Sequence, residues 1–342
     1  DKQATELFAE FKRITLEEVD KVYKRLGITF DSYNGEAFYN DKMQPIIDAL
    51  KQKNLLVESD GAMVVNLDEY GMPPCLILKS DGATLYATRD LAAAVYRKNT
   101  YDFYKNLYVV AYQQNLHFKQ LFKVLELLGY DWAKDCVHVP FGMVSLEGVG
   151  AMSTREGKVV KLKDVLSEAV DKTKAIISQK NPELENKDET AEAIGVGAVV
   201  FGALINGRIK DVVFSVDKAL NFDGETGPYL QYTHARCCSI LSKGEAGEAD
   251  YSTLTDDETF ELVRLLSRFD QTVTVAAERY EPSIISRYLI DLAQAFNKFY
   301  IGHRVICDDE KLQSSRLAIT KAVRDALRNG MSLILLKTPK KM

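Results

Sequence analysis

The stretch Asp211–Arg236, DVVFSVDKALNFDGETGPYLQYTHAR, limits the fold most strongly because its local pattern changes twice. It opens with the β-branched run Val212–Phe214, which favours a strand. The cluster Asp223–Pro228 then breaks regular structure, since glycine, proline and small polar residues favour turns. From Pro228 onward the pattern predicts a helix, because proline fits a first helical position, where its missing N–H would have no partner. The chain therefore passes here from a strand-containing region into helices.

One face of this predicted helix collects two tyrosines and an arginine. Tyr229, Tyr232, Ala235 and Arg236 recur at spacings of three and four, which places them side by side on a helix. Such a face can stack on unpaired bases and reach phosphate. Spacing alone favours the alternative, in which the tyrosines are core residues with satisfied hydroxyls. The residue pattern leaves both interpretations open.

Composition indicates a globular chain of two or three domains. The chain has 342 residues, of which 46% are hydrophobic and 27% charged, and it contains no apolar run long enough to span a membrane. Five irregularly placed cysteines predict reduced thiols, and four scattered histidines show no zinc spacing. The net charge of −5 does not indicate a nucleic-acid partner. Residues 311–342, however, are strongly basic, which is typical of a phosphate-binding face or of a solvated helix surface.

Hydrophobic periodicity predicts the other elements. Helices are expected over residues 4–27, 40–53, 91–96, 119–128, 162–179, 191–205, 258–278, 283–300 and 312–336. Strands are expected over residues 57–67, 75–79, 107–111, 137–140 and 141–146. The last three helices predict a bundle.

Polar segments follow two of these predicted elements. Tyr112–Phe118 comes directly after the apolar run 107–111, and ligands in open α/β sheets bind at the carboxyl ends of strands. Residues 147–158 offer hydroxyls, exposed backbone N–H groups and a cation, which suit a polyphosphate, although solvent loops often have the same composition. Thr88 is predicted to cap a helix and to place Asp90 in its first turn, where a carboxylate can simply complement the helix dipole.

Four motifs occur in one order along the chain. They are YATRD at residues 86–90, QQNLHF at 113–118, MSTREG at 152–157 and GPYLQYTHAR at 227–236. Together they resemble the arginyl-tRNA synthetases, and the resemblance runs nearly from end to end. It implies a partial Rossmann-like nucleotide-binding α/β domain with a small β insertion, followed by an all-α helical bundle that binds the anticodon.

The resemblance also implies a domain order. We expect the C-terminal part of a class I catalytic domain over residues 1–165, a helical junction over 166–210 and the anticodon-binding domain over 211–342. The family's His-Ile-Gly-His signature, which belongs to the first half of the catalytic domain, has no proper counterpart here. Tyr300–His303 is similar to it, but it lies late in a predicted helix with no strand before it.

The resemblance assigns catalytic-domain roles to individual residues. Tyr86, Asp90 and Gln114 would bind the substrate arginine, whose planar guanidinium suits a carboxylate. His117, Met152, Ser153 and Arg155 would bind ATP. The candidates for catalysis are Met152, Ser153, Thr154 and Arg155, which match the Lys-Met-Ser-Lys-Ser loop of class I synthetases. Ala151 and Thr154 stand where that loop has its lysines, and Asn115 stands where the family more often has aspartate.

The same resemblance names the residues and partners for tRNA. The tRNA-binding candidates are Tyr229, Tyr232, Arg236, Tyr300 and Met342. The implied partners are tRNA(Arg), L-arginine, ATP with Mg²⁺ and a missing N-terminal half, without a prosthetic group or a protein-held metal. A cytoplasmic monomer that ligates arginine to tRNA is expected. The alternative is a non-catalytic tRNA-binding fragment of such an enzyme, and ATP–pyrophosphate exchange by the chain alone would separate the two.

Overall fold

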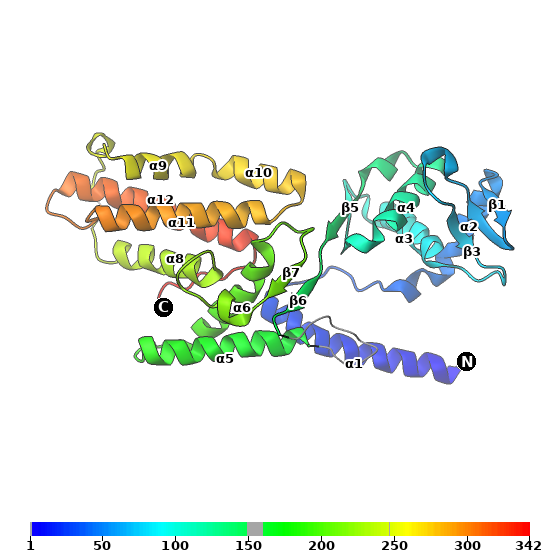
Figure 1. Ribbon diagram of the computed structural model, residues 1–342, viewed down its shortest axis with the longest axis horizontal. Coiled ribbons are helices and arrows are strands. Elements are labelled where there is room, and N and C mark those ends of the chain that lie inside the picture. The colour runs from blue at the N-terminus through cyan, green and yellow to red at the C-terminus, as the bar shows by residue number, and fades with distance from the viewer. Residues whose placement is uncertain (1, 149–159, 246) are drawn as a thin grey trace. The chain divides into compact units, whose positions relative to one another are not determined.

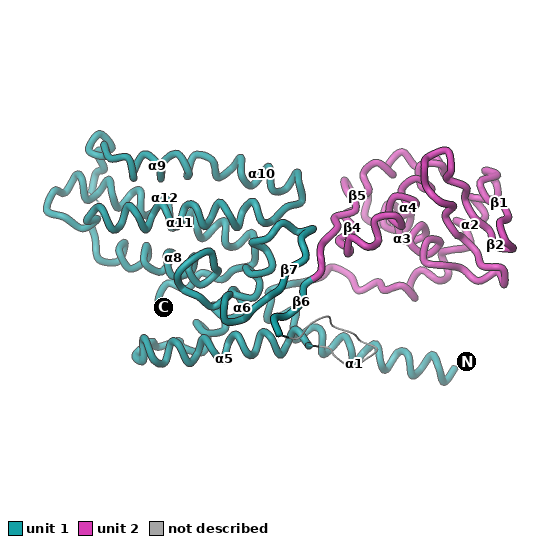
Figure 2. Tube along the Cα trace, in the orientation of Figure 1, with its two compact units in different colours: residues 1–29, 144–342 teal, residues 30–143 magenta. Residues whose placement is uncertain are grey.

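A computed structural model describes residues 2–148, 160–245 and 247–342. The chain forms two compact units (Figures 1 and 2): one contains residues Phe30–Met143, and the other contains Asp1–Thr29 together with Val144–Met342. Within the described residues, no helix is both long and apolar enough to cross a membrane. The predicted ATP-loop residues Met152, Ser153, Thr154 and Arg155, and Ala151 beside them, lie outside the described residues.

The unit of residues 30–143 contains a small antiparallel sheet packed with helices. The sheet has the order β1-β2-β3, as predicted for this region, and its first hairpin turns at Asp60–Gly61, both of which have positive φ. Its strands are β1 (Leu56–Ser59), β2 (Ala62–Val65) and β3 (Cys75–Leu78). Its helices are η1 (Glu36–Lys42), α2 (Met43–Gln52), η2 (Asp68–Tyr70), α3 (Tyr86–Tyr101), η3 (Tyr112–Gln114), α4 (Asn115–Leu127) and η4 (Asp131–Asp135).

A parallel strand pair in the same unit carries the polar segment that the sequence singled out. β4 (Asn106–Ala111) pairs in parallel with β5 (Cys136–Phe141), and α4 connects them, which gives a β-α-β unit. Tyr112–Phe118 therefore lies at the carboxyl end of β4, as predicted. An apolar run such as 107–111 is typical of a strand buried on both faces. Here, however, Leu107 is 44% exposed and Val109 is 65% exposed, whereas Tyr108 is buried.

The helix α3 begins earlier than predicted. Leu85 is the N-cap residue and Tyr86 is already helical. Thr88 does not cap the helix; its buried hydroxyl donates instead to the carbonyl of Ile77 in β3, at 2.5 Å. Asp90 consequently lies beyond the first turn, and dipole complementation does not explain it.

The other unit is mainly helical. Its helices are α1 (Lys2–Leu26), α5 (Leu162–Lys180), α6 (Lys187–Leu204), α7 (Val216–Ala219), α8 (Gly227–Leu241), η6 (Tyr251–Thr253), α9 (Asp257–Leu266), α10 (Phe269–Arg279), α11 (Ser283–Gly302) and α12 (Glu310–Leu333). β6 (Val144–Leu146) and β7 (Val212–Phe214) pair in parallel, so the strand predicted at Val212–Phe214 is confirmed.

The bundle contains one more break than its sequence pattern predicted. Residues 258–278 form two helices, α9 and α10, instead of one. The Ser267 hydroxyl donates to the carbonyl of Arg264, and this local hydrogen bond competes with continued helix at the break. α12 ends at Leu333 rather than at Leu336, and Leu335 has a positive φ of 60°.

The helix α8 begins where Pro228 predicted it. Thr226 is the N-cap residue, and its hydroxyl oxygen accepts a hydrogen bond from the backbone N–H of Tyr229 at 3.2 Å. α8 packs against α6, α11 and α12 (Figure 1), and its Leu230 and Cys237 are fully buried. Phe296 and Phe299 of α11 complete the centre of this core. The bundle therefore fixes α8 on three sides.

Two glycines of α6 lie where neighbouring elements leave no room for a side chain. A Cβ atom added at Gly195 would lie 2.7 Å from the backbone of Val170 in α5, and one added at Gly202 would lie 2.6 Å from the Phe214 ring. These glycines sit inside a helix that no strand leads into directly, so they are not a dinucleotide-binding fingerprint. Close packing against α5 and β7 is the reason for them.

Gly195→Ala is expected to lower the free energy of unfolding by about 1–3 kcal/mol, because backbone cannot yield to the added methyl group as a side chain can. Urea unfolding followed by circular dichroism measures the change. Gly207→Ala is the control, since nothing lies within 4 Å of its Cβ position, and it should change stability by less than about 0.5 kcal/mol. Equal effects of the two substitutions would contradict the packing explanation.

Candidate functional site

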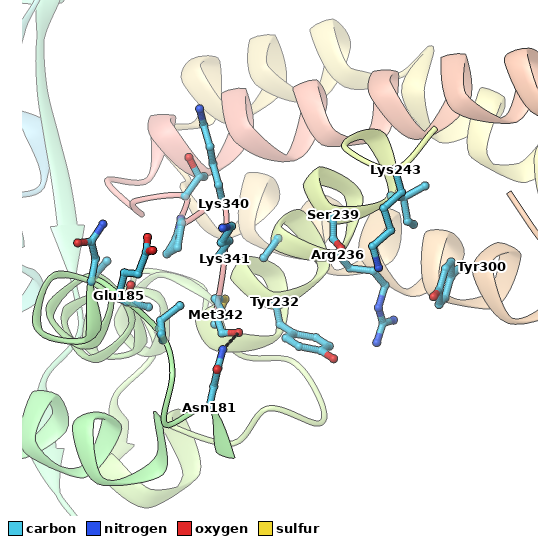
Figure 3. Close-up of a pocket in the computed structure, with 18 of the residues that line it drawn as sticks. Asn181, Glu185, Tyr232, Arg236, Ser239, Lys243, Tyr300, Lys340, Lys341 and Met342 are labelled. Carbon is cyan, nitrogen blue, oxygen red and sulfur yellow. Dashed lines mark hydrogen bonds between the residues drawn. The ribbon is translucent and has the colours of Figure 1, made fainter. Parts of the chain in front are cut away.

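A large groove opens along α8 in the mainly helical unit (Figure 3). Its volume is about 1520 Å³, and α8, the end of α11, the segment after α5 and residues 337–342 line it. Basic residues outnumber acidic ones along its walls. The basic residues are Arg236, Lys243, Arg304, Lys337, Lys340 and Lys341, and the acidic ones are Glu183, Glu185 and Glu189. The groove therefore offers a wide and mainly cationic surface.

Three of the residues that were predicted to bind tRNA meet inside this groove. The guanidinium carbon of Arg236 lies 4.9 Å from the ring centre of Tyr232 and 5.1 Å from that of Tyr300. The two rings come from different helices, α8 and α11, and are 43% and 41% exposed. Arg236 also donates to the side-chain oxygen of Asn297, which fixes its position. Exposed rings beside a held guanidinium form a surface on which bases can stack.

Tyr229 has a different environment from Tyr232. Its ring packs against the bundle core, and its hydroxyl accepts a hydrogen bond from Asn297 Nδ2 at 2.9 Å. Tyr229 thus matches the core alternative, whereas Tyr232 presents an open ring to the groove. Asn297 holds both Tyr229 and Arg236. The sequence did not indicate this role, because Asn297 belongs to none of the four motifs.

Three side chains form hydrogen bonds with backbone carbonyls of residues 337–342, the segment that contains Met342. Gln231 Nε2 donates to the Lys337 carbonyl at 2.8 Å, His234 Nδ1 bonds the Pro339 carbonyl at 3.1 Å, and Asn181 Nδ2 donates to the Met342 carbonyl at 3.1 Å. Met342 also packs against the apolar cluster of Ile177, Ala191 and Ile194. Sequence reasoning missed Gln231, His234 and Asn181 as anchors, because a backbone carbonyl leaves no trace in the sequence of its partner.

Burial sets the protonation of His234. The residue is 3% exposed, and burial lowers the pKa of its imidazole below the ordinary value of 6.5, although the hydrogen bond to Pro339 opposes the shift. Arg324 and Arg328 of α12 lower this pKa further, and Asp325 raises it. The Cys238 thiol lies 3.9 Å from both ring nitrogens. The neutral imidazole is therefore the form that suits the folded protein.

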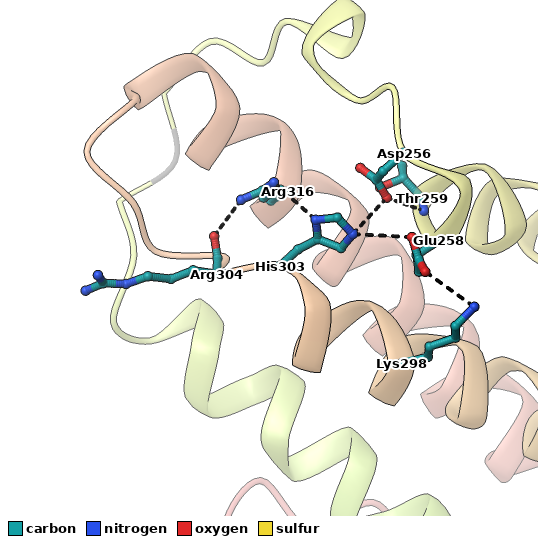
Figure 4. A network of polar contacts seen from close by, with 7 residues as sticks. All are labelled: Asp256, Glu258, Thr259, Lys298, His303, Arg304 and Arg316. Carbon is teal, nitrogen blue, oxygen red and sulfur yellow. Dashed lines mark hydrogen bonds and ion pairs between the residues drawn. The ribbon is translucent and has the colours of Figure 1, made fainter.

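His303 joins the end of α11 to the start of α9 (Figure 4). It follows the last residue of α11, and its Nε2 lies 3.3 Å from Asp256 and 3.5 Å from Glu258, at the start of α9. These three residues have the spacing of a metal site. Arg316, however, approaches Nδ1 at 3.4 Å, and a guanidinium can only donate. The imidazole hydrogen is then on Nε2, between the carboxylates, which favours a hydrogen-bonded clasp over a metal site.

Two catalytic-domain candidates meet in the unit of residues 30–143. His117 Nε2 of α4 lies 2.7 Å from Asp90 Oδ2 of α3, although the first was assigned to ATP and the second to arginine. Tyr86 lies one turn before Asp90 on α3 and is 69% exposed. Gln114 is exposed at the carboxyl end of β4. The Asp90 carboxylate can thus accept a hydrogen bond from a nitrogen donor. Tyr86 and Gln114 supply further polar side chains in the same unit.

Comparison with known families matches both parts of the chain. The family model "tRNA synthetases class I (R), catalytic domain" matches residues 1–216, and the model "DALR anticodon binding domain" matches residues 230–342. The arginine–tRNA ligase of Halothermothrix orenii is 54% identical over 345 residues, and that of Clostridioides difficile is 53% identical over 345 residues. Both matches cover 100% of this chain and 61% of the relative, so the chain spans about 61% of the length of these proteins.

Solved structures give the same result. Thermus thermophilus arginyl-tRNA synthetase matches with a TM-score of 0.90 and 27% identity, over 99% of this chain and 65% of that chain. The arginyl-tRNA synthetase of Plasmodium falciparum matches with a TM-score of 0.88 and 25% identity, over 100% of this chain and 59% of that chain. The predicted fold class, an α/β region with small sheets followed by a helical bundle, is confirmed.

Protonation of His234 is expected to lower the free energy of unfolding at mildly acidic pH. Since the pKa of His234 is lower in the folded state than its ordinary 6.5, its contribution to stability is complete above about pH 6.5 and is lost as the pH falls through the lowered value. Urea unfolding at about pH 7.5 and 5.5 should show a smaller loss for His234→Gln, whose amide donates to Pro339 but does not titrate. Parallel losses in both proteins would refute this role.

Proposed function

The chain belongs to the arginine-type class I tRNA synthetases, and from this premise we propose that it is part of an arginine–tRNA ligase. In the proposed reaction, the carboxylate of L-arginine attacks the α-phosphorus of ATP, which gives arginyl-adenylate and releases pyrophosphate. The 3′-terminal hydroxyl of tRNA(Arg) then takes the arginyl group, and AMP leaves. No covalent intermediate with the protein is needed, so the protein acts by positioning and by stabilising phosphate charge.

The observation that carries this proposal is the group of Tyr232, Arg236 and Tyr300 in the basic groove. All three lie in the part of the chain that matches the anticodon-binding model. Two half-exposed rings beside a guanidinium suit unpaired bases, and the surrounding lysines suit a phosphate backbone. An anticodon loop offers both features. We assign Met342 and, by its support of Asn297, Tyr229 to the same interface.

Asp90 is proposed to bind the side chain of the substrate arginine. A guanidinium presents a planar fork of donors that one carboxylate accepts, and lysine offers only a point charge. The 2.7 Å approach of His117 shows that Asp90 faces a nitrogen donor on α4. Tyr86, on the same face of α3, and Gln114, at the end of β4, would complete this pocket.

ATP is proposed to bind with Mg²⁺ on its phosphates. The resemblance assigns ATP to His117, Met152, Ser153 and Arg155 and adds Thr154 as a candidate for catalysis. Arg155 would offset the charge that develops on the leaving pyrophosphate. Magnesium bound to ATP would need no cage of protein ligands, and no prosthetic group takes part. We further propose a cytoplasmic monomer whose nucleotide site is completed by a catalytic-domain half that carries the His-Ile-Gly-His signature.

A second candidate function is tRNA binding without catalysis. The observation that favours it is the exposed side of β4, where Leu107 and Val109 face away from the described core of their unit. A nucleotide-binding sheet normally buries such residues on both faces. The groove along α8 serves either function, whereas the arginine pocket serves only the first.

Asp90→Asn is expected to weaken L-arginine binding by about 2 kcal/mol, because the charge-assisted hydrogen bonds to the guanidinium are lost. Isothermal titration with L-arginine, and with L-lysine for comparison, measures the effect. Asp102→Asn is the matched control, since Asp102 ends the same helix and asparagine tolerates its left-handed backbone. Unchanged arginine affinity in Asp90→Asn would remove Asp90 from the substrate site.

Tyr232→Ala is expected to weaken binding of tRNA(Arg) by about 1–3 kcal/mol through the loss of base stacking, and to abolish the preference over a non-cognate tRNA. Filter binding or fluorescence across a salt series measures both quantities. Tyr251→Ala is the control, because Tyr251 is 64% exposed in the same unit but does not line the groove. Weak and equally salt-sensitive binding of both tRNAs to the unmodified chain would show backbone attraction alone and contradict the proposal.

A further inference from the structure

Residues 337–342, here called the strap, form one wall of the basic groove (Figure 3). The three side chains that hold the strap come from two places in the fold. Gln231 and His234 lie one turn apart on α8, and Asn181 directly follows α5. They bond the carbonyl oxygens of Lys337, Pro339 and Met342, and use none of the strap's side chains. The anchors therefore fix the path of the strap backbone, whatever side chains it carries.

Gln231 is a fully buried polar anchor, and the burial of its side-chain amide is unfavourable. It is 0% exposed, and its Nε2 donates both to the strap and to the Ala193 carbonyl of α6 at 3.0 Å. Its Oε1 is buried without a hydrogen-bond partner among the described residues. An unsatisfied buried amide oxygen destabilises a fold, so packing alone would favour an apolar residue of similar size here. The amide is explained by the strap that it holds.

The backbone anchoring leaves the strap lysines available to the groove. Lys340 and Lys341 are exposed, and both line the groove together with Lys337. Among the described residues, no carboxylate forms an ion pair with Lys340 or Lys341. A lysine on a fixed backbone loses less freedom when it binds a phosphate than one on a free tail, so fixing the strap strengthens each contact.

We propose that Gln231, His234 and Asn181 are positioning residues that hold the strap in register, so that Lys340 and Lys341 bind successive phosphates of the RNA in the groove. This inference rests on the proposed tRNA binding and adds to it a role for residues that need not touch RNA. Phosphate contacts of this kind set the orientation of a bound nucleic acid, and base contacts then supply specificity. The strap would thus align the anticodon loop with Tyr232 and Tyr300.

A double-mutant cycle on the full chain tests the inference. The variants are Gln231→Met, which removes the anchoring amide at similar volume, the pair Lys340→Ala with Lys341→Ala, and all three substitutions together. Binding of tRNA(Arg) is measured between about 0.1 and 0.4 M salt. The lysine pair should weaken binding about tenfold at the low end and reduce the salt slope by about 1.4, which corresponds to two phosphates of a single strand. Gln231→Met should approach the same loss, and the triple variant should be no weaker than the lysine pair.

Matched controls separate positioning from charge and from folding. Lys210→Ala with Lys311→Ala removes equal charge outside the groove, and Gln271→Met repeats the chemical change on an exposed face of α10. Trypsin cleavage after the strap lysines should accelerate in Gln231→Met while the urea midpoint stays within the range of the controls. Asn181→Ala, which alters a partly exposed anchor, gives a second measurement if Gln231→Met does not fold.

The outcomes distinguish the two proposals. Losses that add in the triple variant, or trypsin cleavage of the strap that is unchanged in both Gln231→Met and Asn181→Ala, would overturn the positioning role even though tRNA still binds. Unmodified chain that binds no tRNA would overturn the proposed function and the phosphate role of the strap. In that case faster trypsin cleavage of the strap in Gln231→Met would still confirm the anchoring itself.

Discussion

The structure of the mainly helical unit depends on the burial of α8 between α6, α11 and α12. A helix packed on three sides has few positions that can reach solvent, and α8 uses each face differently. Leu230 and Cys237 fill the core, Gln231 and His234 hold the strap, and Tyr232 and Arg236 open into the groove. Because one rigid helix carries all three sets, the packing of the core also sets the geometry of the groove.

Close approach makes this arrangement possible. Gly197 of α6 lies against the Gln231 amide, where an added Cβ would be 3.0 Å from Nε2, and Gly227 at the start of α8 lies against the backbone of α6. Small residues at the crossing bring the amide within reach of the Ala193 carbonyl. The same crossing leaves Gln231 Oε1 without a partner, which is a cost that the strap contacts offset.

The two units carry separate groups of polar residues. In the mainly helical unit, the groove, its charge and its stacked residues are all in place. In the unit of residues 30–143, Asp90 and His117 already form a pair from α3 and α4, and Tyr86 and Gln114 stand on the adjoining surface. A carboxylate that accepts from an imidazole nitrogen can also accept from a guanidinium, since both groups present N–H donors.

The amino-acid sequence by itself determined the elements and the order of the motifs. The β-branched run before β7, the proline that opens α8 and the period of α11 are local signals, and local signals survive without knowledge of the fold. What only the tertiary structure decided depends on contacts between distant residues. Thr88 bonds β3 instead of capping α3, and Asn297 of α11 gives Tyr229 and Tyr232 different roles, because it bonds the hydroxyl of Tyr229. The strap anchors Gln231, His234 and Asn181 bind backbone carbonyls that every residue possesses, so no sequence pattern could reveal them.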